Sequence, residues 1–203
     1  ILNENAPAIF FLHGYGSNME DLFSLSQFFS DEWAIISFQA SESIGFGGYA
    51  WAELDFNNLR QLPKPEQKVD SINNIHNSIS ALASKFNFDK NQIYILGFSQ
   101  GSDLALSTGF KFPNFYKGII SLCGYFDIKK VEYELNHAAL KNLNIFLSSA
   151  VYDDKVPVHL GRMTNLSLKK MGLTPTYFEY NTGHTISNEC LTNVLDWLNL
   201  IKK

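Results

Sequence analysis

A serine stands between two glycines in the pentapeptide Gly-Phe-Ser-Gln-Gly, residues 97–101. The apolar run at residues 93–96 is typical of a buried strand, and a helical pattern follows over residues 102–112. Glycine on each side lets the backbone turn sharply enough to lift a hydroxyl above a sheet. The pattern therefore predicts that Ser99 is the nucleophile of an acyl transfer. An ordinary glycine-rich turn between a strand and a helix is the alternative.

A serine hydroxyl is a weak nucleophile and needs a neighbouring base. The chain contains five histidines, of which His184 alone follows an expected strand in a glycine-containing loop and precedes an expected helix. This placement favours His184 as the base. We expect His13, in the loop after the first strand, to shape that loop. The remaining histidines lack such a context: His76, His137 and His159.

A histidine base needs a carboxylate that orients its ring and stabilises the imidazolium. The order serine, aspartate, histidine along the chain is the order of α/β-hydrolases. Asp153 and Asp154 both follow the expected strand at residues 144–149, so either could supply the carboxylate. We expect Asp103 to sit in the first turn of a helix and Asp127 in a turn or a cap.

The negative oxygen of an acyl-transfer intermediate needs backbone N–H donors. One donor should be the N–H of Gln100, the residue after the nucleophile. The second should come from the loop after the first strand, where we choose Tyr15. Losing one such donor typically costs about 3 kcal/mol of transition-state stabilisation.

Alternating strand and helix patterns must position these residues. Apolar runs predict strands at residues 8–12, 33–38, 93–96, 118–122, 144–149 and 176–180. Three-and-four spacing of apolar residues predicts a helix at residues 69–86, and we expect further helices at residues 102–112, 158–171 and 186–201. We expect one α/β domain over residues 1–203, with a mostly parallel sheet, helices on both faces and no separate cap domain. The candidate residues follow strands, at the edge where α/β sheets bind ligands.

The segment over residues 39–65 has little clear helical or strand period. Long segments of this kind in compact domains are usually functional or disordered. Its apolar side chains surround Gly45, Gly47 and Gly48, so we hypothesise a mobile wall of an apolar acyl pocket. The substrate-binding candidates are Phe46, Tyr49 and Trp51. Other apolar members are Ile44, Leu54 and Phe56. The alternative is a loop that merely packs on the core.

Composition excludes several classes of protein. The 203 residues are 45% hydrophobic and only 18% charged, with a net charge of −4, which excludes a disordered chain and an overall basic footprint for nucleic acid. No apolar run approaches the roughly 20 residues of a membrane span. Cys123 and Cys190 lie far apart, which predicts two reduced, buried thiols. No metal-ligand spacing is present, and we expect neither a metal nor an organic cofactor.

The chain starts at Ile1 and not at methionine, so we expect a trimmed N-terminus. The cytoplasm is the default expectation for its location. The expected partner is a small-molecule or lipid ester, with no nucleic acid and no integral membrane association, and the expected assembly is a monomer or a weak homodimer.

Five short stretches match one family in family order: residues 11–16 (Phe-Leu-His-Gly-Tyr-Gly), 50–51 (Ala-Trp), 96–101 (Leu-Gly-Phe-Ser-Gln-Gly), 153–157 (Asp-Asp-Lys-Val-Pro) and 183–184 (Gly-His). Together they resemble the phospholipase/carboxylesterase family of small α/β-hydrolases, which includes the acyl-protein thioesterases. The resemblance implies an α/β-hydrolase fold. The family's Asp-x-x-Val-Pro pattern selects Asp153 over Asp154, and its His-Gly pair selects Tyr15 as an oxyanion donor.

The resemblance implies a serine hydrolase that cleaves carboxylic esters through an acyl-enzyme on Ser99, with lysophospholipids or acyl-thioesters as further substrate classes. Two alternatives stay open: a catalytically silent binding module, and a peptidase or acyltransferase on the same fold. The chain departs from the common family pattern at Gln39–Ser41, where Ala-Pro is frequent, and at Asp103 and Asp154, where small residues and proline are frequent.

Overall fold

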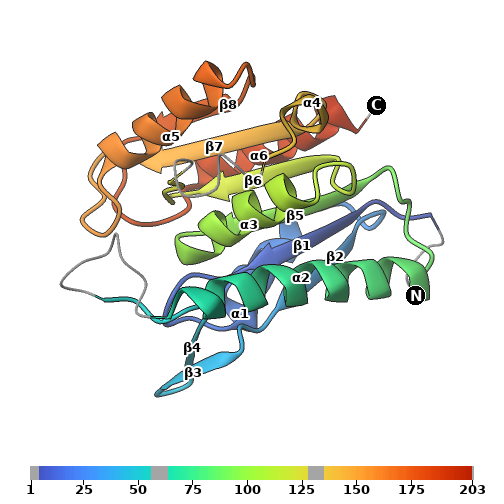
Figure 1. The fold of residues 1–203 in the computed structure, drawn as a ribbon, viewed down its shortest axis with the longest axis horizontal. Helices are drawn as coiled ribbons and strands as arrows, with labels where there is room; N and C mark the ends of the chain where they lie inside the picture. The colour runs from blue at the N-terminus through green and yellow to red at the C-terminus, as the bar shows by residue number, and fades with distance from the viewer. Residues whose placement is uncertain (1–4, 56–63, 128–134, 203) are drawn as a thin grey trace.

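A parallel sheet of six strands organises the computed structural model, which describes residues 5–55, 64–127 and 135–202 (Figure 1). The strands lie in the order β2-β1-β5-β6-β7-β8, and every neighbouring pair is parallel. Their bounds are β1 Ala8–Leu12, β2 Ala34–Phe38, β5 Ile93–Phe98, β6 Gly118–Leu122, β7 Asn144–Ala150 and β8 Thr176–Tyr180. The predicted α/β class, with its mostly parallel sheet, is confirmed.

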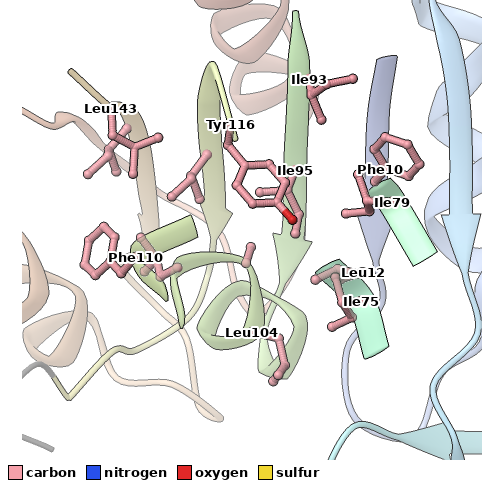
Figure 2. Packing of buried hydrophobic residues seen from close by; sticks show 14 of the residues in the cluster. Phe10, Leu12, Ile75, Ile79, Ile93, Ile95, Leu104, Phe110, Tyr116 and Leu143 are labelled. Carbon is pink, nitrogen blue, oxygen red and sulfur yellow. The ribbon is translucent and has the colours of Figure 1, made fainter. Parts of the chain in front are cut away.

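Successive residues of the central strands alternate between two hydrophobic cores. In β1, Phe10 and Leu12 belong to one core, whereas Ile9 and Phe11 belong to the other. All five residues of β1 are fully buried, which explains the uninterrupted apolar run in its sequence. Figure 2 shows the first core, where Phe10 and Leu12 lie near Ile79 and Ile75 of a covering helix.

Helices cover both faces, as right-handed crossovers require. The first core is closed by α2 (Pro65–Lys85), α3 (Gln100–Lys111) and α5 (Val158–Lys170), with the short α4 (His137–Leu140) at its edge. The second core is closed by α1 (Met19–Phe23) and α6 (Asn188–Ile201), and a 3-10 turn, η1 (Ser24–Phe28), follows α1. Among the described residues, none of these helices is both long and apolar enough to cross a membrane.

A small antiparallel hairpin lies below α1, at the lower left of Figure 1. It consists of β3 (Glu42–Gly45) and β4 (Gly48–Ala50), so the prediction of an irregular segment was wrong here. Its pairing shifts register between Ser43 and Gly45, which breaks the period-two pattern that identifies strands. Of the expected segment, residues 56–63, including Phe56, lie outside the described residues.

Helix α2 begins earlier than the apolar spacing predicted, at Pro65 and not at residue 69. Its first turn holds proline, glutamate, glutamine and lysine, which carry no apolar period. Proline suits this position because its fixed φ matches a helix and no N–H partner is needed there. Its buried residues, which include Ile72, Ile75 and Ile79, pack in the first core.

Candidate active site

Ser99 occupies a strained turn between β5 and α3. Its φ is 54° and its ψ is −117°, a conformation that side-chain-bearing residues rarely adopt. The flanking glycines are required by close backbone contacts. A Cβ atom at Gly97 would lie 2.0 Å from the carbonyl oxygen of Gly101, and one at Gly101 would lie 2.0 Å from that of Leu12. The turn therefore needs glycine at both positions, as the motif predicted.

Ser99, His184 and Asp153 come together at the carboxyl ends of β5, β8 and β7. His184 Nε2 lies 2.9 Å from Ser99 Oγ, and His184 Nδ1 lies 2.7 Å from Asp153 Oδ2. Nδ1 can donate only when it carries the proton, which leaves Nε2 to accept the serine proton. The structure thus gathers the three residues into a continuous hydrogen-bonded chain.

The Asp153 carboxylate is buried and held by the backbone. Its Oδ1 atom accepts the N–H groups of Lys155, at 2.9 Å, and Val156, at 2.8 Å. These bonds leave Oδ2 directed at His184. Asp154 is exposed instead and pairs with Lys155 at 3.1 Å, and the hydrogen bond from that ammonium lowers the pKa of Asp154. The neighbouring aspartates therefore have different surroundings.

The loop after β1 carries the buried His13. Its Nδ1–H donates to the Gly14 carbonyl at 2.8 Å, and its Nε2 accepts the N–H of Ala40 at 3.1 Å. This arrangement suits the neutral ring, and burial lowers the pKa of His13. The other histidines belong to helices, with His76 in α2, His137 in α4 and His159 in α5.

The two proposed backbone donors belong to segments that lie next to Ser99. Gln100 is the first residue of α3, directly after the nucleophile. Tyr15 follows Gly14, where an added Cβ would lie 3.3 Å from the Cβ of Ser99. The next residue, Gly16, has a φ of 82° and donates its N–H to the Tyr49 carbonyl at 2.9 Å. The loop of residues 13–16 therefore lies against the serine.

Sequence reasoning missed the Gln100 side chain. Its Oε1 accepts the backbone N–H of Trp51 at 2.9 Å, and its Nε2 donates to the Ala52 carbonyl at 2.7 Å. The Trp51 indole N–H donates to the His13 carbonyl at 2.8 Å. No sequence signal indicated these bonds, because they join residues 38 to 49 positions apart.

The three substrate-binding candidates have different surroundings. Trp51 is buried in the first core at 4% exposure, and it also lines a small pocket of about 120 Å³ together with Phe38 and Gln39. Tyr49 is half-buried against the same core and pairs with Ser17 through its backbone. Phe46 is fully exposed at the hairpin turn. Of the three candidates, Phe46 is therefore the one that is fully exposed to solvent.

An open groove of about 680 Å³ lies beside the loop that carries Tyr15. The groove joins that loop to the hairpin through Phe46, with Gly16, Ser17, Asn18, Glu20 and Asp21 among its other lining residues. Its polar and acidic lining differs from the apolar pocket expected from the sequence, because the polar N-terminus of α1 faces it where apolar hairpin residues were expected.

Both cysteines are unpaired and buried, as predicted. Burial raises the pKa of the Cys123 thiol to about 12, so this thiol stays protonated. It donates to the carbonyl of Thr185, the neighbour of His184, at 3.5 Å. Within the described residues, no cluster of three or more histidine, cysteine, aspartate or glutamate side chains could hold a metal ion.

A family model, curated proteins and solved structures are all similar to this chain. Residues 3–202 match the model of a family described as Phospholipase/Carboxylesterase. An acyl-protein thioesterase 1 of Candida albicans is 25% identical, covering 97% of this chain and 93% of the relative. A probable carboxylesterase (SOBER1-like) of Arabidopsis thaliana is 26% identical, covering 94% and 77%. The crystal structure of esterase PE8 superposes with a TM-score of 0.83 at 25% identity, covering 99% and 95%.

Proposed function

The chain belongs to the phospholipase/carboxylesterase family, and on that premise we propose that it hydrolyses carboxylic esters or acyl-thioesters through an acyl-enzyme on Ser99. It is a serine hydrolase of the carboxylesterase and thioesterase type. The observation that carries the proposed roles is the hydrogen-bonded chain from Ser99 through His184 to Asp153.

The reaction has two steps. His184 Nε2 takes the proton of Ser99 Oγ while Oγ attacks the carbonyl carbon, and the resulting imidazolium then protonates the leaving alcohol or thiol. Water, deprotonated by His184, next attacks the acyl-enzyme and releases the carboxylic acid and free Ser99. Asp153 keeps the ring in the required tautomer throughout.

Negative charge develops on the carbonyl oxygen in both steps. We assign the backbone N–H groups of Tyr15 and Gln100 to that oxygen, because both residues belong to segments that lie next to Ser99. Phe46 and Tyr49 are the proposed substrate contacts, because the hairpin meets the loop of Tyr15 at the groove.

A substrate panel tests this function directly. Wild-type protein should release p-nitrophenol from short acyl esters or a free thiol from an acyl-thioester, and Ser99→Ala should lower kcat by roughly 10⁴ or more. The exposed Ser30 provides the matched control, since Ser30→Ala changes a serine outside the site. A folded wild-type protein without activity on the panel, or an active Ser99→Ala variant, would refute the proposal.

A further inference from the structure

The proposed oxyanion donors come from chain segments that are far apart in sequence, and something must set the distance between them. Tyr15 lies in the loop after β1, whereas Gln100 begins α3. Oxyanion donors act only at about 2.7–3.1 Å from the developing charge. A small error in the relative position of the two segments would therefore weaken transition-state binding.

Residues 48–52, which we call the strap, contact both segments. At one end, the Tyr49 carbonyl accepts the Gly16 N–H at 2.9 Å, and the Tyr49 N–H donates to the Ser17 carbonyl at 2.8 Å. A Cβ at Gly48 would lie 2.6 Å from the Gly16 carbonyl oxygen, so the two backbones are as close as glycine permits. The strap thus fixes the chain just after Tyr15.

Trp51 fixes the same loop from its other side. Its indole N–H donates to the His13 carbonyl at 2.8 Å, and its ring lies 5.2 Å from the His13 imidazole, centroid to centroid. Trp51 is itself immobilised, because its carbonyl accepts the Ser71 hydroxyl at 2.6 Å and its side chain is buried. Hydrogen bonds from the strap therefore bracket Tyr15.

The Gln100 side chain then ties the strap to α3. Its amide makes two bonds to the strap backbone, to the Trp51 N–H at 2.9 Å and to the Ala52 carbonyl at 2.7 Å. Because the amide donates to and accepts from the same backbone segment, it fixes both the distance and the orientation of the strap relative to Gln100. The strap is therefore hydrogen-bonded both to the first residue of α3 and to the loop after β1.

We propose that Trp51 and the Gln100 side chain are positioning residues that set the separation of the two oxyanion donors. This inference rests on the proposed function. It gives Trp51 a role in turnover through the His13 carbonyl and not through contact with the acyl chain. Removing the indole bond of Trp51 or the amide bonds of Gln100 should weaken binding of the tetrahedral transition state, while ground-state binding of the ester stays almost unchanged.

The test uses Trp51→Phe, which keeps an aromatic ring and deletes the N–H, and Gln100→Met, which keeps the side-chain length and deletes both amide bonds. Trp33→Phe is the matched control, because Trp33 packs in the second core on the opposite face. Each purified variant is measured for kcat and KM on one p-nitrophenyl ester, for thermal unfolding, and for inhibition by a trifluoromethyl ketone that forms a tetrahedral adduct.

We expect kcat to fall about 10- to 100-fold in both site variants, somewhat less than for complete loss of a donor. KM should stay within about threefold, and Ki for the ketone should rise by the same factor as kcat falls. Trp33→Phe should leave kcat, KM and Ki unchanged. Unchanged kcat and Ki in either folded site variant, or parallel rises in KM and Ki, would overturn the inference. An inactive wild type would instead refute the proposed function.

Discussion

His184 Nε2 lies 2.9 Å from Ser99 Oγ, although 85 residues separate the two in the chain. They meet because β5 and β8 run parallel in one sheet and end at the same edge. The ring of Phe98, next to Ser99, also lies 4.8 Å from the His184 ring, centroid to centroid. We therefore expect substitutions that disturb this contact to lower kcat.

Adjacent aspartates provide a matched pair of variants. Asp153→Asn should lower kcat by about 10³- to 10⁴-fold, since an amide can donate to Nδ1 and so favour the wrong tautomer. Asp154→Asn should leave kcat within about twofold, because the Asp154 carboxylate is exposed and contacts Lys155. Steady-state kinetics on one p-nitrophenyl ester distinguish the two variants. Equal losses in both would contradict the assignment of Asp153.

The nucleophile turn should tolerate no side chain at Gly101. Gly101→Ala should lower the free energy of unfolding by roughly 3 kcal/mol or more, or prevent folding, because its Cβ would meet the Leu12 carbonyl oxygen at 2.0 Å. Gly172→Ala is the control, with a positive φ of 79° but no atom within 4 Å of the new Cβ. It should cost only about 1–2 kcal/mol. Urea unfolding measures both, and similar losses would argue against the backbone clash.

The sequence predicts features that depend on neighbouring residues, but not contacts between residues far apart in the chain. Strand β1 is recognisable because each of its residues is buried, and Ser99 because glycines must flank the turn. The hairpin of β3 and β4 escaped prediction because its strands are short and its register shifts. The position of Trp51 in an apolar segment predicts a contact with substrate, whereas its indole bond to the His13 carbonyl depends on the tertiary fold and has no signal in the sequence.

Stability should decrease as the pH falls below about 6.5. Burial lowers the pKa of His13 and of His76 from the ordinary value of 6.5. Below that value the unfolded chain binds protons that the folded chain does not, so protonation favours unfolding, and this loss is absent above pH 6.5. The His76 ring stacks on Phe112 at 3.6 Å, centroid to centroid, and bonds to the Tyr116 hydroxyl.

His76→Gln tests this linkage away from the site. Thermal unfolding at pH 7.5 and pH 5.5 should show a smaller decrease in Tm for the variant than for the wild type. Activity at pH 7.5 serves as the control and should be unchanged, because His76 lies in α2 outside the hydrogen-bonded chain of Ser99. An identical decrease in Tm for both proteins would show that His76 contributes nothing to the pH dependence.

The exposed Phe46 tests the proposed substrate contact. Phe46→Ala should leave Tm unchanged, since the ring is fully exposed, and should raise KM for medium-chain esters more than for acetate esters. Phe28→Ala removes a second exposed ring, in η1, and is the control. A KM that is unaltered for every chain length would remove Phe46 from the set of substrate contacts.

Labelling with a fluorophosphonate probe tests the central claim most directly, because the probe reacts with an activated serine whatever the natural substrate is. Folded wild-type protein should carry one phosphonyl group, which peptide mapping by mass spectrometry places on Ser99. Ser99→Ala should remain unlabelled. A folded wild-type protein that stays unlabelled at Ser99, or equal labelling of the Ser99→Ala variant, would contradict the assignment of Ser99 as the nucleophile.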